Sequence, residues 1–134
     1  SFLVDKYNYL LKKTKLPSSN FLIKTRLNYI NSFIHSSIMF RKSKFNEAMG
    51  YDESIPRAQD FDLWLRLARN PELKFANLPE AYLDYRVHPH QARGRKEAYA
   101  LSAGYLFREF LLSGAFSHLA GSLTFALKGL IRGR

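Results

Sequence analysis

A carboxylate at the start of a short apolar segment is the feature of this chain best suited to chemistry. Asp60 lies within residues 58–67, which read AQDFDLWLRL. Leu63 and Leu67 are four residues apart and Trp64 adds a large ring, so this segment predicts a helix with one buried side. Free amide groups and the helix dipole favour a carboxylate in the first turn. Asp60 there can serve as a catalytic base or only as a helix cap, and the residues alone leave both interpretations open.

A second carboxylate, Asp62, precedes Arg66 by four residues, a spacing that allows an ion pair along the helix. Residues two apart on a helix point in different directions. We therefore interpret Asp62 as structural and do not expect it to form a catalytic dyad with Asp60.

The elements around these aspartates follow from local patterns. The central helix is expected over residues 59–69, where Asn70-Pro71 stops it. Residues 33–41 predict a buried strand, and residues 42–49 predict a short helix closed by Gly50.

Elsewhere, apolar spacing predicts helices over residues 2–13 and 21–30 and from about residue 96 to the end, with an interruption at Gly114. Short extended segments are expected at 74–78 and 81–87. The expected fold class is α+β, mostly helical with a few short strands.

Four motifs in sequence order resemble the C-terminal part of family 2 glycosyltransferases of the GT-A type. They are His35-Ser36-Ser37-Ile38-Met39-Phe40-Arg41-Lys42-Ser43, Gly50-Tyr51-Asp52-Glu53, the segment from Ala58 to Arg66, and Tyr85-Arg86-Val87-His88. The resemblance covers about residues 28 to 92. It implies an inverting transfer of a sugar from a nucleotide-sugar donor to a hydroxyl of a glycan or lipid-linked acceptor. The nature of the sugar does not follow from it.

The resemblance also implies roles for individual residues. Asp60 takes the position of the general base, although Gln59 replaces the acidic residue that often precedes it in the family. His88 takes the position of a late histidine that approaches the divalent metal, Mg²⁺ or Mn²⁺, or the diphosphate; the alternative is a surface histidine. Arg86 is a candidate for phosphate binding or a solvated strand residue. His35 and Ser36 are candidates for acceptor binding or a polar strand entry.

Other parts expected of such an enzyme are missing from the sequence. We find no Asp-x-Asp motif after a buried strand and no glycine-rich phosphate loop. The chain begins at Ser1, so we expect a piece of a longer protein. Residues 1–95 would form the acceptor-side part of a glycosyltransferase domain, and residues 96–134 an amphipathic helical extension. Alone, the chain should bind nucleotide weakly at most and should not catalyse sugar transfer.

The composition allows other classes of function. The 134 residues suit one domain, and the absence of cysteine excludes disulfides and thiolate metal sites. A net charge of +10 suggests an anionic partner. A non-catalytic basic module that binds anionic membrane or nucleic acid is therefore an alternative, as is a helical self-association module. Nucleic acid is disfavoured because the basic residues are spread along the chain.

The C-terminal region has an unusual charge pattern. Residues 110–127 carry no formal charge but contain three serines, two glycines, a threonine and a histidine, flanked by Arg108, Lys128, Arg132 and Arg134. This pattern fits an interfacial helix better than a membrane span. The alternative is a helix packed on its own domain or on a second copy in a homo-oligomer. We expect a cytoplasmic protein, with attachment at the cytoplasmic face of the membrane as a secondary interpretation beside the packed helix.

Overall fold

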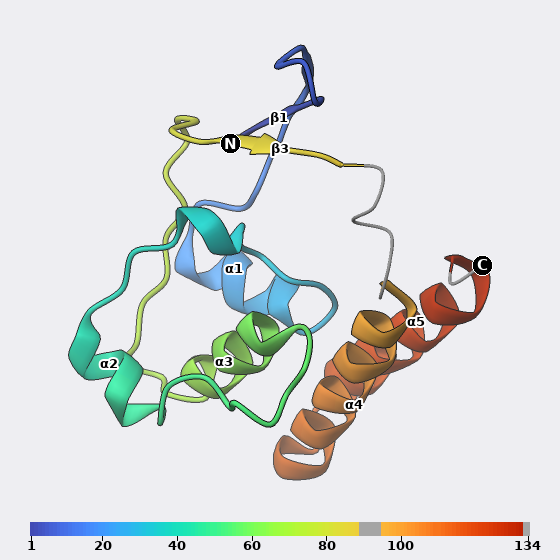
Figure 1. Ribbon diagram of the computed structural model, residues 1–134. Helices are drawn as coiled ribbons and strands as arrows, with labels where there is room; N and C mark the ends of the chain where they lie inside the picture. Colours follow the sequence, from blue (N-terminus) through green and yellow to red (C-terminus); the bar gives the residue numbers. More distant parts are fainter. Residues whose placement is uncertain (89–94, 133–134) are drawn as a thin grey trace.

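The computed structural model describes residues 1–88 and 95–132. Within these residues, helices and a small three-stranded sheet confirm the α+β class (Figure 1). The helices are α1 (Asn20–Leu27), α2 (Lys42–Glu47), α3 (Gln59–Ala68), α4 (Arg95–Ser113), α5 (Phe116–Arg132) and the 3₁₀ turn η1 (His35–Ser37). The strands are β1 (Phe2–Val4), β2 (Leu10–Lys13) and β3 (Asp84–Arg86). The sheet lies at one end of the molecule, and α4 and α5 form a pair beside α3 (Figure 1).

The helix predicted for residues 2–13 is wrong, because this segment forms a β-hairpin. Strand β1 pairs antiparallel with β2 and parallel with β3, which is about eighty residues away in sequence. In the turn, Asp5 Oδ1 accepts hydrogen bonds from the backbone N–H groups of Tyr7 and Tyr9 at 2.8 and 2.9 Å. Asn8 there adopts a φ of 71°. This turn chemistry and a distant strand partner outweigh the local helical spacing.

The strand predicted for residues 33–41 is also wrong. The segment contains η1, where the Ser37 side chain and backbone N–H both donate to the Ile34 carbonyl at 2.9 Å. Such local bonds compete with strand pairing. Phe33 is buried without a sheet, since its ring meets the edge of Trp64 at 5.4 Å between centroids. Residues 74–78 are likewise not a strand, whereas the expected segment 81–87 contains β3.

Several boundaries were predicted well. Helices α1, α2 and α3 fall within the expected ranges to within a few residues. Gly50 closes the turn after α2 with a φ of +64°, and its N–H donates to the Phe45 carbonyl at 2.9 Å. Gly114 separates α4 from α5 with a φ of +68°. Both glycines occupy the left-handed region that other residues avoid, which is why they end helices.

The core joins α3 to its neighbours on both sides. Phe61 and Leu63 of α3 are buried with Ile23 and Leu27 of α1 and with residues of the α4–α5 pair, including Leu106 and Phe125. Because α3 packs on both sides, it is the element best placed to hold side chains in fixed positions. None of the helices in the described ranges has the length and apolarity needed to cross a bilayer.

Candidate functional site

Helix α3 presents Asp60 in its first turn, as expected. The capping position before the helix belongs to Ala58, which adopts a φ of 56° and has no side chain able to cap. Its carbonyl accepts the backbone N–H groups of Phe61 and Asp62 at 3.0 and 3.2 Å. Asp60 is therefore not the capping residue of α3, although the helix dipole still favours a negative charge at this position.

A single neutral side chain holds Asp60 in place. Asn31 Nδ2 donates to Asp60 Oδ2 at 2.9 Å, while Asn31 Oδ1 accepts the backbone N–H of Phe33 at 3.0 Å. The asparagine is thus fixed by its own backbone contact and orients one carboxylate oxygen. Among residues 1–88 and 95–132, no other group donates a hydrogen bond to Asp60. Its second oxygen is left for a proton or a ligand.

Two aromatic side chains and a histidine lie around the same end of the molecule as Asp60. The His35 ring lies 5.7 Å from Tyr51 and 6.2 Å from Trp64, measured between centroids. Burial, and then the negative charge of Asp60, raise the pKa of Tyr51 above its usual value. The structure thus brings His35, a predicted site residue, to the helix that carries Asp60. Ser36, the next residue of η1, is exposed to solvent.

A cavity of about 250 Å³ opens beside Asp60. Asn31 and Asp60 contribute to one side, and Tyr99, Ser102 and Lys128 of the helical pair line the other. From the sequence, residues 96–134 were expected to form a helical extension with no part in the site. In the structure, α4 and α5 supply part of the cavity wall next to the candidate base.

A larger cavity of about 1010 Å³ is lined by Trp64 and Leu67 of α3. Cationic and aromatic side chains share its lining, among them Lys13, Lys15, Arg41, Lys44, Lys74, Phe40, Phe45 and Tyr82. The acidic residues Glu72 and Glu80 also line it. Helix α3 therefore contributes to two cavities, a small one at Asp60 and, one turn further along at Trp64, a large one whose charged lining residues are mainly basic.

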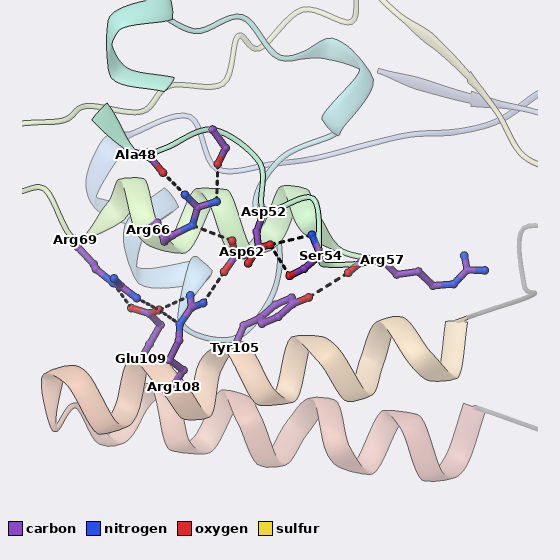
Figure 2. A network of polar contacts seen from close by, with 11 residues as sticks. Ala48, Asp52, Ser54, Arg57, Asp62, Arg66, Arg69, Tyr105, Arg108 and Glu109 are labelled. Carbon is purple, nitrogen blue, oxygen red and sulfur yellow. Dashed lines mark hydrogen bonds and ion pairs between the residues drawn. The ribbon is translucent and has the colours of Figure 1, made fainter. Parts of the chain in front are cut away.

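The other aspartate of α3 is enclosed in an ion-pair network (Figure 2). Asp62 is 1% exposed; its Oδ2 accepts from Arg66 Nε at 2.8 Å and its Oδ1 from Arg108 Nη1 at 2.6 Å. Arg66 also donates to the carbonyls of Ala48 and Gly50. The predicted pair of Asp62 with Arg66 is confirmed, and both carboxylate oxygens are occupied. Asp62 therefore fastens α3 to α4 and to the loop after α2.

The network continues along α4 through a second buried carboxylate. Glu109 accepts from Arg69 at 2.7 and 2.8 Å and from Arg108 at 2.8 and 3.1 Å (Figure 2). Burial alone would raise the pKa of Glu109, but the hydrogen bonds from Arg69 and Arg108 outweigh it and lower the pKa below its usual value. Glu109 is thus held as a charged group between the end of α3 and α4.

The two remaining predicted site residues lie at the sheet. Arg86, in β3, donates from Nη1 to the Lys6 carbonyl at 3.1 Å. His88 follows β3 and is exposed. In the part of the chain that the structure describes, no hydrogen bond or ring contact joins His88 to Asp60, and no three His, Asp or Glu side chains gather as a metal site. The metal and phosphate roles of these residues stay predictions.

Sequence reasoning missed Asn31, Tyr99 and Arg108. Asn31 gave no signal, because an asparagine near the end of a helix is common in turns. Arg108 had a signal that was not used: Arg108 and Glu109 are charged residues inside an otherwise apolar helical stretch. Such charges need partners when the helix is buried. Their partners, however, are some forty residues away and are fixed only by the packing of α4 on α3.

Comparisons with known proteins find two relatives. The chain is 31% identical over 131 residues to "O-antigen biosynthesis glycosyltransferase WbnJ" of Escherichia coli, a match that covers 97% of this chain and 51% of WbnJ. It is 33% identical over 87 residues to "Uncharacterized glycosyltransferase MJ1057" of Methanocaldococcus jannaschii, covering 64% of this chain and 29% of that protein. Its relatives are named glycosyltransferases.

This likeness supports a role in glycosyl transfer. The chain spans about half the length of WbnJ and less than a third of MJ1057. No protein-family model matches it, and no solved structure matches it significantly. The family 2 assignment and the GT-A type therefore rest on the motifs alone.

Proposed function

We propose that this chain is the acceptor-side, C-terminal part of an inverting family 2 glycosyltransferase of the GT-A type, with Asp60 as its general base. The enzyme would transfer a sugar from a nucleotide-sugar donor to a hydroxyl group of a glycan or lipid-linked acceptor. The observation that carries the proposal is the position of Asp60. It is a carboxylate with one oxygen oriented by Asn31, the other unoccupied among the described residues, and a cavity beside it.

The size of that cavity favours an acceptor group over a whole donor. Sites for drug-sized ligands measure roughly 300–1,000 Å³. At about 250 Å³, the cavity at Asp60 suits the hydroxyl-bearing end of an acceptor. Ser102 and Lys128 in its wall offer polar contacts to such a group. The donor would bind mainly to the part of the longer enzyme that lies outside the match to this chain.

In the proposed step, Asp60 accepts the proton of the acceptor hydroxyl. The acceptor oxygen forms a bond to the anomeric carbon while the bond from that carbon to the diphosphate oxygen breaks, and the nucleoside diphosphate leaves. Attack from the face opposite the leaving group inverts the anomeric configuration. Asn31 contributes by holding the carboxylate so that its unbonded oxygen faces the reacting group.

Other predicted residues have supporting parts in the proposal. His35 lies beside Trp64 and Tyr51, so with Ser36 it is a candidate contact for the acceptor. Arg86 is a candidate contact for a donor phosphate. Mg²⁺ or Mn²⁺ would neutralise charge on the diphosphate. The described residues do not form a metal site by themselves. We therefore propose His88 as one ligand only and derive no catalytic step from the metal.

The test is the Asp60→Asn variant of the longer enzyme, with sugar transfer and donor binding measured separately. Asparagine keeps the shape and still accepts the hydrogen bond from Asn31, but it cannot take a proton at neutral pH. We expect turnover to fall roughly 10²- to 10⁴-fold, the usual contribution of a general base, while donor affinity stays unchanged.

Glu53→Gln is the matched control, because Glu53 is an exposed acidic residue in the loop before α3. It should retain normal turnover. An Asp60→Asn enzyme that keeps its turnover would remove Asp60 from the mechanism. Activity lost equally in both variants would point to the net charge of this region and would also contradict the assignment.

A further inference from the structure

Helix α5 has two different apolar faces, and only one of them packs on the protein. Its inner face carries Gly121, Phe125 and Gly129, which are buried against α4 and the core. A Cβ added at Gly121 would lie 1.9 Å from the Asn28 carbonyl oxygen, and one at Gly129 would lie 3.6 Å from Tyr99 Cβ. The close approach at Gly121 fixes the rotation of α5 about its axis, so the direction of its other face is also fixed.

The outer face of α5 is apolar and open to solvent. Phe116, Leu123, Leu127 and Leu130 are spaced by seven, four and three residues, so they form one stripe along the helix. Each of these side chains is between 57% and 76% exposed, and Ile131 beside them is 74% exposed. An amphipathic surface helix normally turns charged and polar residues outward. Here the outward stripe is built from leucine, isoleucine and phenylalanine.

The stripe continues across the turn between the two helices. The rings of Phe107 and Phe110 are 6.2 Å apart, and those of Phe110 and Phe116 are 5.7 Å apart. Leu111 and Leu112 at the same end of α4 are more than 60% exposed. The exposed apolar residues therefore form a continuous surface, which we call the outer face. It consists of Phe107, Leu111, Leu112, Phe116, Leu123, Leu127, Leu130 and Ile131.

The charges near this surface are positive. No aspartate or glutamate occurs from residue 110 to the end, whereas Lys128, Arg132 and Arg134 do. The exposed residues Arg95 and Lys96 begin α4 beside the end of α5, where Tyr99 meets Gly129. The acidic residues of α4 are both paired: Glu97 with Arg57, and Glu109 with Arg69 and Arg108. The exposed Arg95 and Lys96 therefore place positive charge beside the end of the outer face at which α5 ends.

We propose that the outer face binds the surface of an anionic lipid bilayer, with α5 lying in the plane of the interface. Apolar side chains would enter the boundary between headgroups and acyl chains, and the basic end would contact anionic headgroups. A second copy of the chain fits less well, because it would bring the same positive charges together. This inference goes beyond the proposed function and does not depend on Asp60.

The test is binding of the full chain to lipid vesicles, measured by co-sedimentation. Vesicles of phosphatidylcholine with phosphatidylglycerol are compared with phosphatidylcholine alone. The variant carries Leu127→Glu and Leu130→Glu together, two changes at exposed positions that leave the inner face of α5 intact. We expect the wild type to bind the anionic vesicles at least tenfold more tightly than the neutral ones. The double variant should lose at least tenfold in affinity for the anionic vesicles.

The control carries Met39→Glu and Leu78→Glu, which make the same change of charge at residues 97% and 70% exposed and distant from α5. It should bind anionic vesicles nearly as well as the wild type, and circular dichroism should show both variants folded. Asp60→Asn should also bind normally, which separates this inference from the proposed base. The proposal is overturned if the wild type does not bind vesicles or binds both compositions equally well. It is also overturned if the two double variants lose the same amount of affinity for anionic vesicles. A wild-type dimer that becomes monomeric in the α5 variant, with no vesicle binding, would instead make the outer face a contact between copies.

Discussion

Asp60 and Asp62 stand two residues apart on one helix, yet their surroundings differ in nearly every respect. Asp62 is buried, both of its oxygens accept hydrogen bonds, and its two partners are arginines from α3 and α4. Asp60 is half-buried, accepts one hydrogen bond from a neutral asparagine, and borders a cavity. Because the helix turns by about 100° per residue, the two carboxylates face different neighbours. Their chemistry is set by those neighbours and not by residue type.

This difference indicates that the two carboxylates of α3 have different roles. The network around Asp62 links α3 to α4, so it holds the helix that carries Asp60 and the helix that carries Ser102 in one arrangement. A proposed base needs this support, because small displacements of a catalytic group strongly reduce rates. On the proposal that Asp60 is the general base, Asp62 is a positioning residue for it. Three measurements test this contrast.

The largest effect on stability is expected at Asp62. Asp62→Ala would leave Arg66 and Arg108 without their shared carboxylate at a buried position. Removing one partner of a buried ion pair typically costs 3–5 kcal/mol. Arg108 is partly exposed and retains Glu109, so we expect a loss near the lower end, about 3 kcal/mol, in the free energy of unfolding. Urea denaturation followed by tryptophan fluorescence would measure it, because Trp64 is buried on the same helix as Asp62.

Asp60→Ala is the matched comparison, since the same side chain is removed from the same helix. It breaks one hydrogen bond, from a neutral donor to the carboxylate, and removes a favourable first-turn charge at a half-buried position, so a smaller loss of about 1–2 kcal/mol is expected. Equal losses in the free energy of unfolding of the two variants would mean that Asp60 and Asp62 do not differ in their structural role. A larger loss at Asp60 than at Asp62 would reverse the assignment of roles.

The second measurement concerns the pH dependence supplied by Glu109. Its pKa in the folded protein is lowered by Arg69 and Arg108, so folding favours the charged form. Its contribution is therefore complete above the unfolded pKa of about 4.5 and is lost as the pH falls through the lower folded pKa. Glu109→Gln should remove this part of the acid sensitivity and, at pH 7, about 2 kcal/mol of stability from charged hydrogen bonds. Unfolding curves between pH 7 and pH 3 would show it. If the variant and the wild type lose stability in parallel as the pH falls, Glu109 does not carry this dependence.

Much of this contrast could be anticipated from the sequence, because it depends on spacing within one helix. The i, i+4 relation of Asp62 to Arg66, the first-turn position of Asp60 and the stop at Asn70-Pro71 are local features, and the structure confirms them. The glycines that end α2 and α4 were recognised for the same reason. Helical periodicity over residues 96–132 also gave the helical pair correctly, with its break at Gly114.

The features that could not be anticipated depend on contacts between distant segments. The hairpin of β1 and β2 was mistaken for a helix because its pairing with β3 is invisible in a local window. The contacts of Asn31 with Asp60 and of Arg108 with Asp62 join residues 29 and 46 positions apart. The cavity beside Asp60 exists only because α4 and α5 fold back beside α3. The proposed roles of Arg86, His88, His35 and Ser36 remain predictions.

The smallest expected effect is at Tyr105, which lies between the two regions. Its hydroxyl donates to the Arg57 carbonyl at 3.2 Å (Figure 2), and burial followed by the charge of Asp62 raises its pKa to about 12. Tyr105→Phe should cost about 1 kcal/mol at neutral pH by removing that hydrogen bond. Because the folded pKa lies above the usual 10, the contribution is present below pH 10 and declines as the pH rises towards 12. The stability difference between wild type and variant should therefore shrink over this range. A difference that stays constant up to pH 12 would mean that the Asp62 region does not act on Tyr105, and the network would then end at Arg108.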